Sequence, residues 1–111
     1  MESKSAVSAL GALAHETRLE VFRLLVRAGA AGLAVGKIAE ALGVEANGRL
    51  SFHLKELVGA GLATTRQEGR FIYYSTNYPV MTELLRYLTE DCCGGQPCGE
   101  SVAACNQENS L

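Results

Sequence analysis

Apolar residues recur every three or four positions along the first half of the chain, which is the spacing of amphipathic helices. The pattern predicts four helices, at about Ser5 to Leu13, Thr17 to Ala28, residues 34–43 and Gly48 to Ala60. Gly29 and Gly43 stand where the second and third helices are expected to end, because glycine accepts the left-handed backbone of a helix C-cap.

The spacing changes after Gly61. The segment LATTRQEGRFIYYSTN is rich in β-branched and aromatic side chains, so it predicts two short strands joined by a hairpin around residues 67–70. Asn77 is suited to cap a last helix, with Pro79 in its first turn.

The last helix has apolar residues on more than one side, at Val80, Met81, Leu84, Leu85, Tyr87 and Leu88. These residues form two apolar stripes along the helix. We expect one stripe to complete the core of the domain and the other to contact a second copy of the chain, which predicts a homodimer. The alternative is that both stripes belong to the core, since small domains also bury broad helix faces.

The order of these elements is that of a winged helix-turn-helix. We therefore predict an α+β, mostly helical fold with a two-stranded β-hairpin wing. A chain of 111 residues with 48% hydrophobic side chains suits one globular domain. Residues 1–90 are predicted to form the winged helix-turn-helix domain, which would bind DNA and dimerise. Residues 91–111 are predicted to form a flexible cysteine-containing tail that carries the inducer site and is poorly ordered without a ligand.

Charges interrupt the apolar residues of the first segment, MESKSAVSALGALAHETRLEV, every few positions. It therefore has neither the apolar region of a signal peptide nor a membrane span, and we expect a cytoplasmic chain with no membrane partner. All four cysteines lie in the stretch DCCGGQPCGESVAAC, residues 91–105. In a reducing compartment, clustered cysteines are more often metal ligands or redox groups than structural disulfides.

The net charge of the chain is -2, but residues 49–75 are locally basic, with four Arg and Lys against two Glu. In a helix-turn-helix, the N-terminal half of the second helix enters the major groove of DNA. The candidate DNA-binding residues are Asn47, Arg49, Ser51, Phe52 and Lys55 on this helix, with Arg66 and Arg70 at the hairpin tip. Arginine reads guanine and asparagine reads adenine, whereas lysine and serine more often hold phosphate. The alternative is an ordinary solvated helix face.

The two histidines are assigned structural roles. His53 lies one position off the apolar stripe, so we expect it to pack or hydrogen-bond within the domain, whereas His15 precedes a helix and is expected to cap it or lie on the surface. No histidine-based metal or catalytic centre is expected. The chain is not expected to be an enzyme, because a thiol-based reductase needs an electropositive pocket and the tail has only acids beside its thiols.

Three segments, HETRLEVFRLL, KIAEALGV and LSFHLKELVGAGLATTRQEGRFIYYS, closely resemble the ArsR/SmtB family of bacterial metal-sensing winged-helix repressors. The resemblance covers about residues 8–90, with one extra residue in the turn at EANGR. It implies a dimeric repressor that binds an inverted-repeat operator and releases this DNA when an inducer binds.

Two inducer sites of this family are absent from the sequence. Arsenite sensors of the family resemble LCVCDL in the first helix of the turn motif, but Leu33 to Ile38 contain no cysteine. Zinc sensors use Asp, His and Glu on the last helix, but Pro79 to Glu90 contain no histidine. The cysteines at the end of the last helix instead resemble the CCGG-type tail of another arsenite-responsive branch.

The chemistry of the tail supports As(III) or Sb(III) as inducer at Cys92, Cys93 and Cys98. Trivalent arsenic and antimony are soft and bind three thiolates in a pyramid, and soft thiolates select such ions. Adjacent cysteines can bind one ion only if the backbone is not regular helix, which Gly94 and Gly95 permit. Zinc, cadmium or lead, with Cys105 as a fourth ligand, and redox sensing remain as alternatives.

Overall fold

The computed structural model describes residues 1–95 of the chain, and the remainder of the predicted tail, residues 96–111, lies outside the described residues. The elements are α1 (Ser3–Leu13), α2 (Glu16–Ala28), β1 (Leu33–Ala34), α3 (Val35–Leu42), α4 (Gly48–Gly59), β2 (Ala63–Glu68), β3 (Phe71–Thr76), α5 (Tyr78–Thr89) and the 3-10 turn η1 (Cys92–Gly95). The first four predicted helices are confirmed, and each end lies within two residues of its predicted position.

Side chains at the starts of three helices explain why those helices begin where they do. His15 Nδ1 accepts a hydrogen bond from the backbone N–H of Thr17 at 3.2 Å, which caps α2 as predicted. Asn77 Oδ1 accepts one from Val80 N–H at 3.4 Å at the start of α5, where Pro79 lies in the first turn. Asn47 caps α4 in the same way, so each cap satisfies an N–H group that has no partner within its helix.

The core lies where α1, α2 and α4 contact one another and where the sheet and α3 close over them. Its largest fully buried side chains are Val21, Leu25, Ile38, Leu54, Leu57 and Leu62. From α1, only the alanines Ala6, Ala9 and Ala12 are buried. These small side chains let the backbone of α1 approach its neighbours closely, so α1 adds to the core without large apolar groups.

The predicted hairpin is confirmed, because β2 and β3 pair antiparallel with Glu68 opposite Phe71. Gly69 has a φ of 61° at the first of the two turn positions, as a tight hairpin turn requires. The prediction of only two strands was incomplete, since β1 pairs with β3 and makes a three-stranded sheet in the order β1-β3-β2. Strand β1 has only two residues, which is too short to show the alternation of apolar and polar positions that reveals a strand in a sequence.

The backbone before β1 is packed tightly against β3. Gly32 has a φ of 71°, and a Cβ added there would lie 2.5 Å from the carbonyl oxygen of Tyr74. Only glycine permits this approach, so the connection from α2 to α3 is held against the sheet.

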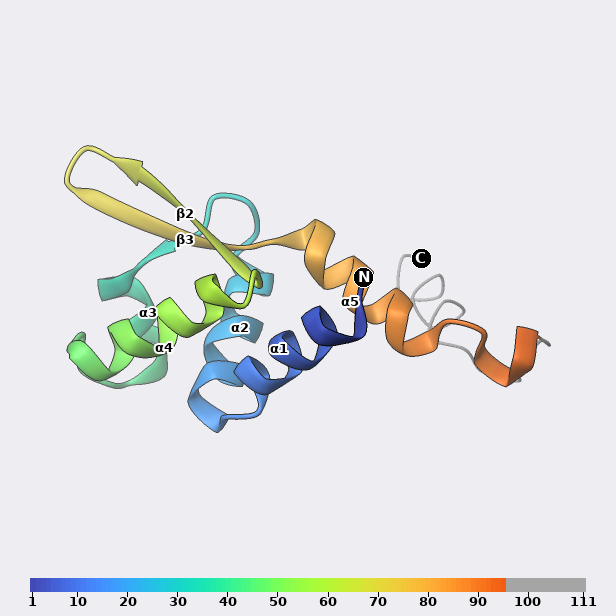
Figure 1. Cartoon of the computed structure of the whole chain (residues 1–111). Helices are drawn as coiled ribbons and strands as arrows, with labels where there is room; N and C mark the ends of the chain where they lie inside the picture. Colours follow the sequence, from blue (N-terminus) through green and yellow to red (C-terminus); the bar gives the residue numbers. More distant parts are fainter. Residues whose placement is uncertain (96–111) are drawn as a thin grey trace.

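The molecule is elongated, with principal extents of 50 × 34 × 24 Å. The β2–β3 hairpin projects from one end, and α5 leads to the opposite end, where η1 carries the first two cysteines (Figure 1). Among the described residues, no helix is long and apolar enough to cross a membrane.

Candidate nucleic-acid interface and cysteine segment

Helix α4 has one buried and one exposed face. Leu50, His53, Leu54 and Leu57 are buried. Ser51, Phe52 and Lys55 lie on the opposite face and are exposed, and Arg49 is exposed in the first turn, as the sequence predicted. Phe52 is 53% exposed, so the domain core does not account for this large apolar side chain.

Asn47 stands directly before this face. Its Oδ1 accepts hydrogen bonds from the backbone N–H groups of Arg49 at 3.1 Å and Leu50 at 3.3 Å. The amide NH₂ group makes no hydrogen bond to a described residue. Asn47 therefore fixes the start of α4 with one end of its amide and leaves two donors at an exposed position.

A groove of about 450 Å³ separates α4 from the wing. Its lining consists of Gly48, Ser51, Phe52, Lys55 and Val58 from α4, with Thr65 and Tyr74 from the sheet. Thr65 and Tyr74 are cross-strand partners, so one face of the hairpin forms the wall opposite α4. The groove brings Ser51, Phe52 and Lys55 to one surface with the wing, whereas Asn47 and Arg49 line a separate pocket at the start of α4.

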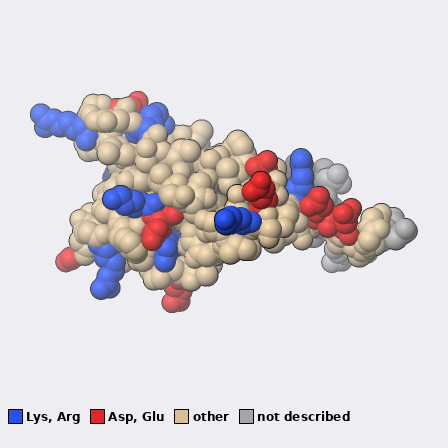
Figure 2. Space-filling model, viewed as in Figure 1, with Lys and Arg blue, Asp and Glu red and all other residues tan. Residues whose placement is uncertain are grey.

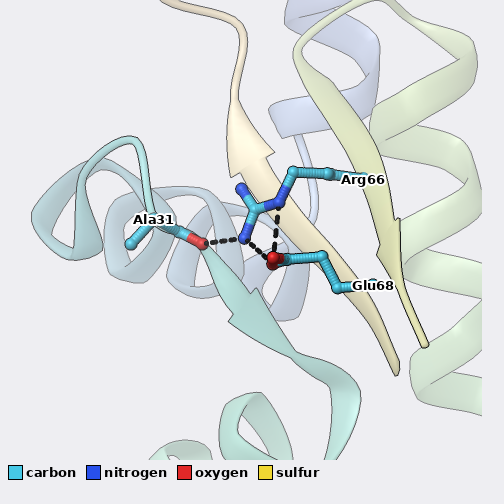
Figure 3. Close-up of polar contacts among 3 residues, drawn as sticks. All are labelled: Ala31, Arg66 and Glu68. Carbon is cyan, nitrogen blue, oxygen red and sulfur yellow. Dashed lines mark hydrogen bonds and ion pairs between the residues drawn. The ribbon is translucent and has the colours of Figure 1, made fainter. Parts of the chain in front are cut away.

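Arg70 lies in the turn of the hairpin, as predicted, but Arg66 does not lie at the hairpin tip. Arg66 is in the middle of β2, where its guanidinium contacts the Glu68 carboxylate through Nη2 at 2.8 Å and Nε at 3.1 Å (Figure 3). Arg66 Nη2 also donates to the carbonyl oxygen of Ala31 at 3.1 Å, and the guanidinium lies 5.1 Å from the ring centroid of Tyr73. These contacts tie the wing to the connection between α2 and α3.

Lys and Arg side chains project from the wing tip and from the helices below it, with acidic side chains among them, and both signs also occur towards α5 and the start of the tail (Figure 2). Residues 49–75 nevertheless carry four Arg and Lys against two Glu, so a net charge of -2 does not prevent this segment from attracting a polyanion.

His53 and His15 lie together, which their separation in sequence did not indicate. Their ring centroids are 4.4 Å apart, and His53 is only 6% exposed, so its predicted packing role is confirmed. Burial lowers the pKa of His53 from its usual 6.5, and the nearby His15, Arg18 and Arg49 lower it further, while Glu56 opposes them. The domain therefore favours a neutral His53 ring.

The first two predicted inducer ligands lie on irregular backbone. Cys93 has a φ of 56° and a ψ of 32°, and Gly94 has a φ of 64°, so the bend that adjacent ligands require is present. The Sγ atoms of Cys92 and Cys93 are 3.8 Å apart, and Cys93 is disulfide-bonded in this structure. Cys98 and Cys105 lie outside the described residues. Within residues 1–95, no group of three or more His, Cys, Asp or Glu side chains is placed to hold a metal ion.

Helix α5 leaves part of its apolar surface uncovered. Leu84 is buried, but Leu85 is 45% and Leu88 is 54% exposed, so the alternative that both stripes belong to the core of one chain is wrong. Helix α1 contacts α5 and also exposes Val7 and Leu10, which the sequence pattern did not single out. Both helices thus present apolar side chains that the other described residues, within 1–95, leave exposed.

Residues 13–66 match a family described as a helix-turn-helix domain, whereas no curated protein matches the chain. Among solved structures, an ArsR-like transcriptional regulator from Rhodococcus sp. RHA1 is 28% identical with a TM-score of 0.67, over 77% of this chain and 76% of that one. HlyU from Vibrio cholerae is 33% identical with a TM-score of 0.61, over 79% of this chain and 97% of that one. HlyU was also solved in a form described as reduced.

A third similar structure is a homodimeric winged helix-turn-helix DNA-binding domain from Mycobacterium bovis, described as a possible ArsR-family transcriptional regulator. It is 25% identical, with a TM-score of 0.61, over 87% of this chain and 89% of that one. The family match at residues 13–66 includes α2, α3 and α4, and so the helix that carries most of the candidate DNA-binding residues.

Proposed function

The chain belongs to the ArsR family of winged helix-turn-helix transcriptional regulators, and from this premise we propose that it is a homodimeric repressor that As(III) or Sb(III) releases from an inverted-repeat operator. The observation that carries the inducer assignment is the 3.8 Å separation of the Cys92 and Cys93 sulfurs beyond α5.

In the DNA complex, the exposed face of α4 enters the major groove. Arg49 and the free donors of Asn47 reach base edges, while Ser51 and Lys55 hold phosphates. Phe52 supplies apolar contact, for which the methyl group of thymine is the matching partner. Arg70 at the wing tip reaches the neighbouring backbone. Arg66 is assigned to the support of the wing, because its guanidinium already contacts Glu68 and Ala31.

The dimer forms through α1 and α5. The exposed Leu85 and Leu88 of α5 and Val7 and Leu10 of α1 give each chain an apolar surface that a second copy can cover. The homodimeric domain from Mycobacterium bovis, which shares the fold, supports this assembly. A two-fold axis places the two α4 helices on half-sites about one turn of DNA apart.

The sulfur separation suits one thiophilic ion. Two thiolates at about 2.3 Å from a common ion, with the tetrahedral angle typical of zinc, lie about 3.8 Å apart, and the smaller angle of a pyramidal trivalent ion brings them somewhat closer. The separation of the Cys92 and Cys93 sulfurs therefore suits a shared thiophilic ion, and Cys93, which is disulfide-bonded in this structure, joins the site after that bond is reduced. Cys98 supplies the third thiolate that trivalent arsenic requires, which the sequence places five residues beyond Cys93.

Ligation is coupled to DNA through α5. The cysteines directly follow this helix, whose Leu84 is buried in the core while Leu85 and Leu88 face the partner chain. Closing the thiolate ring repositions the end of α5, and the two α4 helices lose their spacing. The coupling is reciprocal, so DNA weakens inducer binding by the same factor, for which about 1–3 kcal/mol is typical.

Operator binding by fluorescence anisotropy tests the proposal, with operator DNA selected from random duplexes. Arsenite and antimonite should release the wild-type protein, while zinc and cadmium should not. Serine variants of Cys92, Cys93 and Cys98 should bind DNA normally and resist release, whereas Cys105→Ser is the matched control and should respond as wild type. Release of all three variants by arsenite would refute the site.

Redox sensing is a second candidate, because HlyU, a relative with 33% identity, was solved in a form described as reduced. In that case, peroxide oxidises two thiols of the tail to a disulfide, and two electrons and two protons pass to the oxidant to form water. Thiol counts before and after mild peroxide, paired with operator binding, separate this candidate from inducer binding. Release by peroxide without release by arsenite would favour the redox switch.

A further inference from the structure

A pocket of about 340 Å³ lies where the N-termini of α2 and α4 meet, apart from the groove beside the wing. Its lining residues are Thr17 at the start of α2, Val44, Glu45 and Asn47 in the turn, and Arg49, Leu50 and His53 on α4. The N-terminal turn of a helix carries partial positive charge, so two such ends border the same space.

Basic side chains surround this pocket. Arg49 and His53 line it, and His15 packs against His53 with a centroid separation of 4.4 Å. Arg18 also acts on His53 as a nearby positive charge. Glu45 is the single acid in the lining and Glu56 acts on His53 from nearby, so the positive charge at the cavity comes from Arg49 and Arg18, while the neutral His53 ring contributes a polar group.

Two buried side-chain nitrogen atoms near the pocket lack partners. His53 is 6% exposed, and its Nδ1 has no hydrogen-bond partner among the described residues. The same is true of the buried Nε of Arg18. A buried polar atom without a partner is unfavourable, so a ligand that accepts hydrogen bonds here would stabilise the domain.

We propose that this pocket binds a phosphate group through Arg49, His53 and the hydroxyl of Thr17. A phosphate oxyanion accepts several hydrogen bonds at once, and guanidinium is its matching cationic donor. The same chemistry fits a phosphate of the DNA backbone or a free phosphorylated small molecule. The site does not rest on the assignment of a repressor or of its inducer, because the residues come from α2 and α4 alone.

The two histidines of the chain make the site directly measurable. Both rings lie together at the pocket, and the chain has no other histidine. Every imidazole signal in a ¹H–¹³C NMR spectrum therefore reports on the pocket. Inorganic phosphate is titrated into the full-length protein, with sodium chloride adjusted to constant ionic strength. Both histidine signals should shift and saturate, and sodium chloride alone should not produce these shifts.

Two matched arginine variants define the result. Arg49→Gln removes an exposed, charged donor and should raise the half-saturating phosphate concentration about tenfold or more, as for loss of a charge-assisted hydrogen bond. Arg23→Gln removes an exposed charge of α2 that does not line the pocket and should leave the curve unchanged. Shifts that stay linear with phosphate, or that are the same in both variants, would overturn the proposal.

DNA distinguishes the two sources of the phosphate. If the pocket holds a backbone phosphate, inorganic phosphate should compete with a selected operator duplex, and the duplex should itself shift the histidine signals. If it holds a free anion, inorganic phosphate should shift the histidine signals to saturation, and the duplex alone should not. Either result supports a phosphate site, whereas histidine signals that respond to neither ligand refute it.

Discussion

Asn47 has two separable roles, because its carbonyl oxygen caps α4 while its NH₂ group faces outward beside the proposed DNA surface. The oxygen accepts from Arg49 N–H at 3.1 Å and Leu50 N–H at 3.3 Å. Asn47→Ala removes both bonds and leaves two N–H groups of the first turn to water. Loss of such a cap costs about 1 kcal/mol, within a range of about 0.5–2 kcal/mol.

That cost corresponds to a fall in Tm of about 4–8 °C for a domain of this size. Asn47→Asp keeps an acceptor at the same position and adds a negative charge at a helix N-terminus, which is favourable by about 0.3–1 kcal/mol. Its Tm should therefore equal or exceed that of the wild type. Its affinity for operator DNA should fall about tenfold or more, since the variant lacks the NH₂ donors and places a carboxylate near phosphates.

Thermal unfolding by circular dichroism and operator binding by anisotropy measure the two roles on the same samples. Asn47→Ala should be less stable than the wild type, and Asn47→Asp should be stable but weak in DNA binding. An unchanged Tm for Asn47→Ala would contradict the capping argument. Operator binding by Asn47→Asp at wild-type affinity would contradict the contact between Asn47 and DNA.

Three further predictions concern the wing, the dimer and pH. Arg70→Gln should reduce the slope of log K against log salt concentration by about 0.9, whereas Arg66→Gln should leave it unchanged; equal slopes for the two variants would refute their different assignments. Leu88→Glu should give a folded monomer in analytical ultracentrifugation, because this side chain is 54% exposed and is not needed for the core; a dimer of normal affinity would exclude the α5 surface. The free energy of unfolding should fall as the pH drops below 6.5 toward the lowered pKa of His53, since the unfolded chain then takes up a proton that the buried ring resists. Urea unfolding of the wild type and of His53→Gln across this pH range measures this change. The prediction is wrong if the wild type becomes more stable on acidification and His53→Gln does not.

The segments that the sequence predicted correctly are those that depend on neighbours along the chain. Helix α4 follows from apolar residues spaced for one buried face, whereas the cap by Asn47 was not predicted, although asparagine favours this position. The hairpin follows from β-branched and aromatic runs on either side of Gly69. The exposed face of α4 was predictable for the same reason, because a helix that buries Leu50, Leu54 and Leu57 must turn Ser51, Phe52 and Lys55 to its opposite face.

Contacts between distant segments could not be obtained in this way. Strand β1 exists only because Leu33 and Ala34 pair with β3, about forty residues further along the chain. The position of Arg66 in β2 gave no sign of its bond to Ala31, and nothing in the spacing of His15 and His53 indicated that their rings meet. The sequence alone therefore determined the helices, the caps at His15 and Asn77 and the hairpin, since periodicity and capping act within a few residues. Tertiary structure alone decided the third strand, the support of the wing and the basic pocket, because each depends on side chains that folding brings together from separate elements.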